Sequence, residues 1–477
     1  MRYLIYLLWM LCSFQAAAQL SFYRQYSGSE YDFGQGVVQL PDSSYAITGR
    51  SGSWGLNSEA FILKVHKDGS YDWSQHYGGS EFDEGRRILS IPNQGYYVAG
   101  SSLSDPVAAY DVYLVKTDLI GELQWEKRVD LGAWDFVTDA VLAADSGVLC
   151  VGYSQASSSN VTRGFVLRLD QNGDTLWSRY VGTQAHNSVN AALLLNDTTL
   201  VVAGTYYNLD STLNKGFLAA YHVNGNPLWF TSIGDNGAFG ITDLTLNQNR
   251  YNLTGWKYDA ALGEHDNYSG RYELNGSLFY ESVYVNPGDV ILDEITLNGS
   301  QTKLYVGYRN ENLNDATFGM DVTLGRFNTN YDWDNGPIYI NHGGDEKVEQ
   351  FIPTSDGGAL AVGWITYPMN GGNSIFLMKI GPNDEVQTVV GNEPFLPLVE
   401  NPDLSSLPFT IHPNPAEDYL HLYLPEAIDE MRMVDAQGQL LLQQPLAFGS
   451  HTLDVSYLRA GIYFIQCGQT TRKWVKQ

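Results

Sequence analysis

Acidic side chains are the residues of this sequence best suited to chemistry. The chain of 477 residues carries 53 Asp and Glu residues, and some of them are close neighbours, such as Glu81, Asp83 and Glu84. Hydrolysis of a glycosidic bond needs two carboxyl groups that flank the bond. With so many acids, no single pair stands out. The sequence therefore leaves open a carbohydrate-active enzyme, a glycosidase or a lyase, whose acids come from distant segments.

One segment has the spacing of a calcium-binding loop. Residues 330–336 read Asn-Tyr-Asp-Trp-Asp-Asn-Gly, and a hard cation such as Ca²⁺ needs several oxygen ligands. The glycine comes one position later than in an EF-hand loop, and Asn341 stands where that loop has a glutamate. A strand would show the same alternation. We expect no cofactor, and Ca²⁺ is the one ion that the sequence leaves open.

Motifs for other chemistries are missing from the sequence. The nine histidines are scattered, and neither His-Glu-x-x-His nor Cys-x-x-Cys occurs, so no zinc site is predicted. There is no Gly-x-Ser-x-Gly elbow and no phosphate-binding glycine loop. The net charge of −26 repels phosphate backbones, which argues against nucleic acid as a partner.

A repeat with a period of about 52 residues organises most of the chain. An apolar strand that closes on glycine recurs at intervals of 51, 52, 52, 51, 52 and 56 residues, and a Trp follows it in most copies. The fifth copy has Tyr280 instead of Trp, and the seventh copy lacks an equivalent. The markers are Gly49, Gly100, Gly152, Gly204, Gly255, Gly307 and Gly363, with Trp73, Trp125, Trp177, Trp229 and Trp333.

Each copy contains four strand-like pieces separated by turn residues. In the first copy they are residues 36–40, 45–48, 60–65 and 71–77. Four short strands per copy are typical of a propeller blade. Seven copies predict an all-β fold, a seven-bladed β-propeller over residues 20–391, because a closed ring leaves no exposed sheet edge. A surplus strand-like piece lies at each end, at residues 22–27 and 385–390, and either could complete the ring.

Three short phrases recur in the repeat region. They are Asp-Gly-Gly at residues 356–358, Lys-x-Asp-x-x-Gly-x-x-x-Trp at 116–125 and Tyr-Gly-Gly at 77–79. They resemble the propeller repeats of secreted proteins of the Bacteroidota, which implies a fold but no function. The Gly-x-x-x-Trp part is also similar to the tryptophan-docking motif of quinoprotein propellers, with one residue fewer between Asp and Gly. We expect each Trp to stack on the next blade as a structural contact.

The N-terminus has the pattern of a secretory signal peptide. A positive residue precedes an apolar run over residues 4–12, and Ala16 and Ala18 form an Ala-x-Ala cleavage pattern before Gln19. We therefore predict a signal peptide over residues 1–18. No other apolar stretch approaches the length that spans a bilayer, so no transmembrane anchor is expected.

A small separate domain is predicted at the C-terminus. Residues 392–408 are rich in proline and read as a linker, and strand-like alternation resumes over residues 409–477. The markers of this tail are Pro413, Asn414 and Pro415, then Asp435 and Gly438, then Leu458, Gly461 and Tyr463, and finally Lys476. In this order they resemble the type A C-terminal sorting domain of the type IX secretion system, also called the Por secretion tail.

The resemblance implies a fold, a route and partners. A sorting domain of this type is an immunoglobulin-like β-sandwich that the outer-membrane translocon recognises and a sortase-like peptidase usually removes. The protein would pass through the periplasm and end as a secreted or cell-surface protein.

Function is less strongly indicated than export. The repeats are regular and no catalytic set stands out, so we expect a non-catalytic binding or adhesion protein for extracellular polysaccharide or protein. The loops before each first strand are rich in Asp, Gly and aromatic residues, which suits a polar ligand such as a glycan. The alternatives are the carbohydrate-active enzyme described above and a structural component of a surface layer.

Overall fold

The computed structural model describes residues 21–476 apart from short gaps. These gaps are residues 29, 54–56, 105–108, 133, 156–160, 183–185, 208–213, 235–237, 262, 285–288, 298–302, 312–320, 329–337, 341–344, 367–372, 384, 386–409, 413–418, 425–427, 436–438, 447–448 and 468–469. The regular elements of the described part are β-strands, and that part holds no helix long and apolar enough to cross a membrane. The chain divides into two compact units, residues 1–398 and 399–477, which we describe separately.

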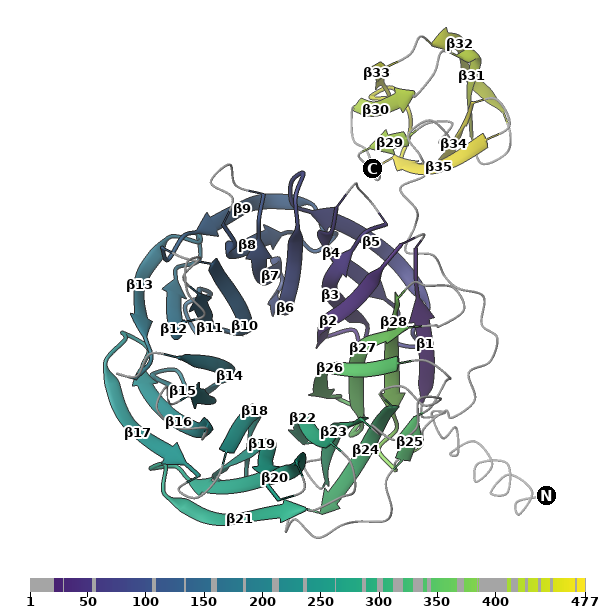
Figure 1. Cartoon of the computed structure of the whole chain (residues 1–477). Helices are drawn as coiled ribbons and strands as arrows, with labels where there is room; N and C mark the ends of the chain where they lie inside the picture. Colours follow the sequence, from purple (N-terminus) through teal and green to yellow (C-terminus); the bar gives the residue numbers. More distant parts are fainter. Residues whose placement is uncertain are drawn as a thin grey trace, which may run out of the picture. The chain divides into compact units, whose positions relative to one another are not determined.

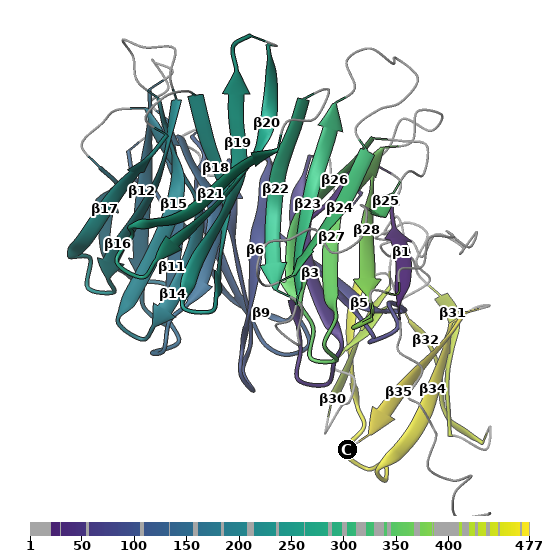
Figure 2. The ribbon, with the colours of Figure 1, turned by 90° about the horizontal axis from the view of Figure 1, so that it is seen from below.

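The described residues of the first unit form seven four-stranded antiparallel sheets. Figure 1 shows these sheets around a central axis, each with one strand innermost and one at the rim. From the side, inner strands such as β6, β22 and β26 run between the two faces of the ring (Figure 2). This arrangement is a β-propeller repeat fold.

The strands of the first four sheets follow one another along the chain. They are β2 (Asp32–Gln39), β3 (Tyr45–Ser51), β4 (Glu59–Val65) and β5 (Tyr71–Tyr77); β6 (Asp83–Ile91), β7 (Gly95–Ser102), β8 (Asp111–Thr117) and β9 (Leu123–Val129); β10 (Trp134–Leu142), β11 (Val148–Gln155), β12 (Thr162–Leu169) and β13 (Thr175–Tyr180); and β14 (Asn187–Asn196), β15 (Thr199–Tyr207), β16 (Asn214–His222) and β17 (Pro227–Ile233).

The next two sheets continue this order, and the seventh takes its outer strand from the start of the chain. They are β18 (Ala238–Asn247), β19 (Arg250–Asp259), β20 (Glu264–Glu273) and β21 (Leu278–Tyr284); β22 (Asp289–Leu297), β23 (Lys303–Glu311), β24 (Asp321–Asn328) and β25 (Ile338–Ile340); and β26 (Asp345–Pro353), β27 (Ala359–Thr366), β28 (Asn373–Ile380) and β1 (Phe22–Tyr26).

The repeated glycines lie where two backbones approach closely. In each of the seven sheets the innermost strand has a bulge or register shift, and the glycine of the second strand faces it. A Cβ on Gly49 would lie 1.8 Å from the carbonyl oxygen of Phe33, and one on Gly100 would lie 1.8 Å from that of Glu84. Only glycine fits such an approach, so the strongest marker of the repeat is a steric one.

The repeated tryptophans pack against the next sheet. A Cβ on Gly121 would lie 2.6 Å from the ring of Trp73, and Gly173 has the same relation to Trp125. Both glycines have positive φ, +83° and +76°, so this turn needs glycine for its backbone as well as for space. The Trp ring therefore joins the outer strand of one sheet to a turn of the next.

The N-terminal strand closes the ring, which answers the question that the sequence left open. Strand β1 pairs antiparallel with β28 as the outer strand of the seventh sheet, and β2 packs against β26, β27 and β28. A Cβ on Gly69 would lie 2.8 Å from the ring of Phe22, so Phe22 takes the place of the Trp that the seventh copy lacks. Most of the competing piece, residues 385–390, lies outside the described residues.

The second unit has two small antiparallel sheets. They are β29 (Thr410–His412), β30 (Tyr419–Leu424) and β33 (Gly449–Asp454), and β32 (Leu440–Leu446), β31 (Ile428–Asp435), β34 (Gly461–Cys467) and β35 (Thr470–Lys476). Apolar side chains from both sheets share one buried core, in which Tyr463 stacks on Trp474 with ring centroids 5.2 Å apart. The hydroxyl of Tyr463 donates to the Arg459 carbonyl at 2.7 Å, which ties β34 to the chain before it.

Candidate functional site

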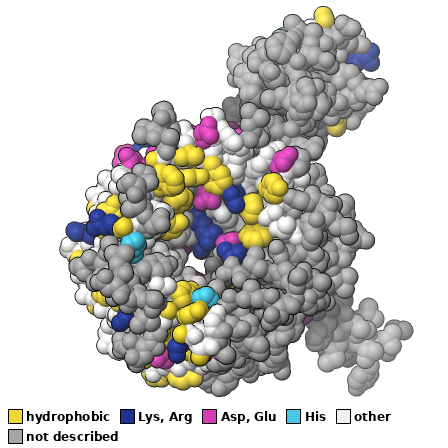
Figure 3. All heavy atoms as spheres, viewed as in Figure 1, with side chains coloured by type: hydrophobic (Ala, Val, Ile, Leu, Met, Phe, Trp, Pro, Cys, Tyr) yellow, Lys and Arg dark blue, Asp and Glu magenta, His cyan; other side chains and the backbone are white. Residues whose placement is uncertain are grey.

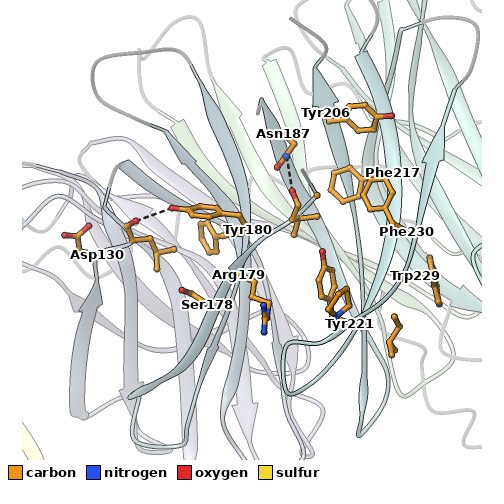
Figure 4. A pocket seen from close by; sticks show the side chains of 16 residues that line it. Asp130, Ser178, Arg179, Tyr180, Asn187, Tyr206, Phe217, Tyr221, Trp229 and Phe230 are labelled. Carbon is orange, nitrogen blue, oxygen red and sulfur yellow. Dashed lines mark hydrogen bonds between the residues drawn. The ribbon is translucent and has the colours of Figure 1, made fainter. Parts of the chain in front are cut away.

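A cleft opens at the rim of the ring between the third and fourth sheets. Its volume is about 1130 Å³, and its lining comes mainly from β13, β15, β16 and β17, together with the start of the β9–β10 connection and the residues after β13 (Figure 4). Seven of the sixteen described lining residues are aromatic. A concave site with aromatic walls and a few polar groups is the usual form of a small-molecule or sugar site.

The aromatic walls come from both sheets. Tyr180 of β13 lies on one side of the cleft, and Phe217 of β16 and Phe230 of β17 lie on the other (Figure 4). Phe217 and Phe230 stack with centroids 5.5 Å apart and an angle of 18° between the rings. Tyr180 and Phe230 remain 38% and 48% exposed, so part of each ring is available to a ligand.

Strand alternation explains why Phe230 faces the cleft. Successive side chains of a strand point to opposite faces. The preceding residue, Trp229, reaches the edge of the cleft but packs against Tyr251 of the fifth sheet, with ring centroids 6.0 Å apart. In the same register, the outer strands β5, β9 and β13 carry Ser74, Glu126 and Ser178. The aromatic ring is therefore a departure from the repeat and not part of its framework.

Polar groups line the same cleft and are held in place by hydrogen bonds. The hydroxyl of Tyr180 donates to the Leu131 carbonyl at 3.2 Å, and the guanidinium of Arg163 lies 4.0 Å above the Tyr180 ring. Asn187 donates to the Val181 carbonyl at 3.1 Å. Burial raises the pKa of the Tyr221 phenol, so this group stays neutral.

A cluster of three carboxyl groups lies beside the cleft and shares Asp130 with its lining. One oxygen each of Asp111, Asp130 and Asp135 lie within 4.8 Å of one another, and Asp130 also lines the cleft. Burial raises the pKa of Asp135 to about 6, and the charges of Asp111 and Asp130 add to the rise. Ser154, which lies opposite Asp135 in the strand pair, lowers this pKa. The Oδ1 atom of Asp135 nevertheless accepts no hydrogen bond from the described residues.

A second group of charges surrounds the ring axis. Figure 3 shows Lys and Arg side chains gathered with acidic ones around the central opening. Arg86 pairs with Glu349 at 2.7 Å, and Arg87 pairs with Asp139 at 2.9 Å. Burial would raise the pKa of Glu349, but Lys347 and Arg86 hold it well below its usual range. These pairs join β6, β10 and β26, so we interpret them as ties between sheets.

The acidic neighbours singled out in the sequence do not form a catalytic pair. Asp83 is fully buried, and its Oδ2 accepts hydrogen bonds from the Gly79 amide and the Ser104 hydroxyl at 2.7 Å each. Glu84 instead accepts from Gln35 at 3.3 Å. The backbone amide of Glu81 donates to the same Ser104 hydroxyl at 3.1 Å. Asp83 therefore organises its loop and is closed to a substrate.

Several predicted residues lie outside the described part of the chain. They are the calcium-like segment 330–336 with Trp333, the cleavage residues Ala16, Ala18 and Gln19, and the tail residues Pro413, Asn414, Pro415 and Gly438. Of the other tail markers, Asp435 closes a turn, because its Oδ1 accepts from the Gln439 amide at 2.8 Å. Leu458 and Gly461 precede or begin β34, and Lys476 ends β35.

The cleft and the three-carboxylate cluster were not among the sequence predictions. Their residues come from different repeat copies, and each one alone reads as an ordinary strand or loop residue. The sequence held one signal for the cleft, the position of Phe230 within its repeat copy. When the copies are aligned on their glycines, Phe230 stands where other copies have Ser or Glu.

Comparison with known families decides the nature of the tail. Residues 410–477 match the model of the secretion system C-terminal sorting domain. The tail is a type IX sorting domain. The protein is therefore exported, to the medium or to the cell surface, and its sorting domain interacts with the secretion system. A search of curated proteins finds no match.

Solved structures similar to the chain contain β-propellers but are distant. Puromycin hydrolase shares 10% identity with a TM-score of 0.46; the match covers 87% of this chain, which spans 58% of that protein. The β-propeller domain of the Trilobed protease from Pyrococcus furiosus shares 11% identity with a TM-score of 0.42, over 80% of this chain and 98% of that domain. Similarities at this level carry no argument about function.

Proposed function

We propose that this protein is an exported, non-catalytic binding propeller that holds extracellular polysaccharide in the cleft between β13 and β17. The observation that carries the proposal is the composition of the cleft. Exposed aromatic faces stand on both sides of it, and of its described lining residues only Asp130 carries a carboxylate. Glycoside hydrolysis needs two, whereas sugar binding needs flat apolar faces next to polar groups.

The architecture that we propose has seven blades and an immunoglobulin-like tail. Seven four-stranded sheets in the described part of the first unit support the blade number, and two sheets around one core support the sandwich. We place a signal peptide at residues 1–18, the propeller at 20–391, a linker at 392–408 and the sorting domain at 409–477. A sortase-like peptidase would remove the last of these.

The test is affinity electrophoresis of the full chain without the signal peptide, in native gels cast with a panel of polysaccharides. We expect at least one polymer to retard the protein. The variant Phe230→Ala removes one wall of the cleft and should weaken binding about tenfold, which corresponds to roughly 1.4 kcal/mol. Phe279→Ala is the matched control, since Phe279 of β21 is 51% exposed but does not line the cleft.

Each other outcome points to a different function. Cleared polymer in the gel would favour the carbohydrate-active enzyme. Assembly into large particles without binding to any polymer would favour a surface-layer component. Retardation that Phe230→Ala leaves unchanged would move the binding site away from this cleft.

A further inference from the structure

The three-carboxylate cluster lies at the junction between the second and third sheets. Asp111 begins β8, Asp130 follows β9, and Asp135 is the second residue of β10. Asp111 and Asp135 are buried, while Asp130 is exposed. Three negative charges whose oxygens lie within 4.8 Å repel one another unless protons or a cation neutralise them.

One oxygen of this cluster is buried without a hydrogen-bond partner. Asp135 is 0% exposed, and its Oδ2 accepts from the Leu131 amide at 2.7 Å. Its Oδ1 is also buried, yet it accepts no hydrogen bond from the described residues. Leaving a buried carboxylate oxygen without a partner is costly, and native proteins normally satisfy such atoms with a hydrogen bond or a metal ion.

The preceding junction holds acids at two of the same positions, with basic side chains close to them. Between the first and second sheets, Glu59 occupies the position of Asp111, and His76 contacts it at 2.5 Å. Asp83 occupies the position of Asp135, and its Oδ1 is likewise buried without a hydrogen bond from the described residues, but a guanidinium nitrogen of Arg128 lies 3.9 Å from it. Basic side chains therefore accompany the acids at that junction.

The next junction has exchanged the acids for other residues. Between the third and fourth sheets, Arg163 and Asn187 stand in the positions of Asp111 and Asp135. Asn187 satisfies both ends of its amide, accepting from the Gly164 amide and donating to the Val181 carbonyl. A convergence of three acids is thus a property of one junction and not a requirement of the fold.

We propose that Asp111, Asp130 and Asp135 bind a Ca²⁺ ion that fastens the β9–β10 connection to the second and third sheets. All three groups offer oxygen, with no histidine or thiolate among them, which suits a hard cation. Ca²⁺ accepts irregular geometry and water as additional ligands, and exposed Asp130 leaves room for water. Mg²⁺ demands near-octahedral geometry and gives up its water reluctantly.

The same ion would set the shape of the cleft wall. The Leu131 amide donates to Asp135, and the Leu131 carbonyl accepts the Tyr180 hydroxyl. Fixing Asp130 and Asp135 thus also fixes Leu131, the hydrogen-bond partner of Tyr180 on that side. The cation site itself does not rest on the proposed glycan binding, because its test needs no polysaccharide.

The first test is calorimetric titration of the chelator-treated full chain with CaCl₂, together with its melting temperature. We expect one strong Ca²⁺ site, a higher melting temperature with Ca²⁺ than with chelator, and a smaller effect of Mg²⁺. Asp130→Asn and Asp135→Asn should each weaken Ca²⁺ binding at least tenfold. Asp197→Asn is the control, because Asp197 is an exposed acid in the β14–β15 turn. Absence of binding, or binding that neither cluster variant weakens, overturns the proposal.

A second test locates the ion without touching a ligand. Trp134 directly precedes Asp135 in the chain. The rings of Trp134 and Tyr110 lie 6.0 Å apart, and the backbone carbonyl of Tyr110 accepts a hydrogen bond from the Asp135 amide at 2.6 Å. Bound Tb³⁺ should therefore emit when Trp134 is excited, and Ca²⁺ should displace it. Trp134→Phe should lose most of the emission and keep the Ca²⁺ heat. Emission that survives in Trp134→Phe would place the ion elsewhere.

Discussion

Phe22 of β1 stands opposite Lys379 of β28. Trp125 stands opposite Lys116 in the same register of another sheet, so β1 restores the pattern of the last repeat. The hydroxyl of Tyr26 also donates to the Gly69 carbonyl at 2.6 Å, as that of Tyr77 does to Gly121 at 2.7 Å. Ring closure thus reuses the contacts between ordinary neighbouring sheets.

The closing strand should therefore be a strong determinant of stability. Phe22 is 3% exposed, and we expect Phe22→Ala to cost about 3 kcal/mol of unfolding free energy, as removal of a buried Phe side chain usually does. Urea unfolding followed by Trp fluorescence measures this. Tyr31→Ala serves as the control, since Tyr31 is 53% exposed. Equal midpoints for the two variants would show that β1 contributes little.

The repeat glycines make a second prediction, about backbone approach. Gly100→Ala should unfold the propeller or destabilise it by more than about 4 kcal/mol, because the new Cβ would lie 1.8 Å from the Glu84 carbonyl oxygen. The variant Gly263→Ala tests the effect of the backbone angle alone, because Gly263 has a φ of +75° and a Cβ at this position would meet no atom within 4 Å. It should cost about 1 kcal/mol. Thermal unfolding of the two variants separates the effects, and similar losses would contradict the steric explanation.

A third prediction concerns pH. Burial raises the pKa of Asp32 from 3.8 to about 6, although hydrogen bonds from Ser51, Gly28 and Ser53 lower it in part. The folded protein therefore holds this proton more tightly than the unfolded chain, and the resulting stability is complete below pH 3.8 and lost as pH rises through 6. Between pH 4 and 7 the wild type should lose about 2 kcal/mol more than Asp32→Asn.

Asn is a suitable replacement because the fourth sheet already carries Asn187 at the equivalent position. Urea unfolding at several pH values measures the difference between Asp32→Asn and the wild type. Parallel pH profiles for the two proteins would mean that Asp32 does not titrate in this range.

The fourth prediction concerns export. A chain that ends before residue 410 lacks the sorting domain and should accumulate in the periplasm, which cell fractionation with immunoblotting detects. Tyr457→Ser is a control within the tail, because Tyr457 is 61% exposed and packs into no core. Normal surface delivery of the shortened chain would contradict the role of the tail.

The sequence predicted most strongly those features that every repeat copy shares. Gly49 and Gly100 recur because the same backbone contact recurs, and Trp73 and Trp125 recur because each outer strand meets a neighbour. Closure by β1 was left open, since the two terminal pieces are equally strand-like and only the folded ring decides between them.

Features that belong to one junction could not be predicted in the same way. Tyr180 and Phe230 meet across two sheets, and Asp111 meets Asp135 only because the β9–β10 connection returns the chain to the inside of the ring. No spacing in the sequence distinguishes such pairs from the many other aromatic and acidic residues of similar strands.

Closure by β1 also means that the ring can close only late in the synthesis of the chain. Strand β1 is made before every other strand of the propeller, but its partner β28 is made only after the other six sheets. Until then β1 lacks its partner strand and presents unpaired backbone groups, which are sites for aggregation. The sorting domain is made after β28, so a chain that displays its export address already contains every strand needed to close the ring. A secretion system that reads this address therefore meets only chains that carry all the strands of the ring.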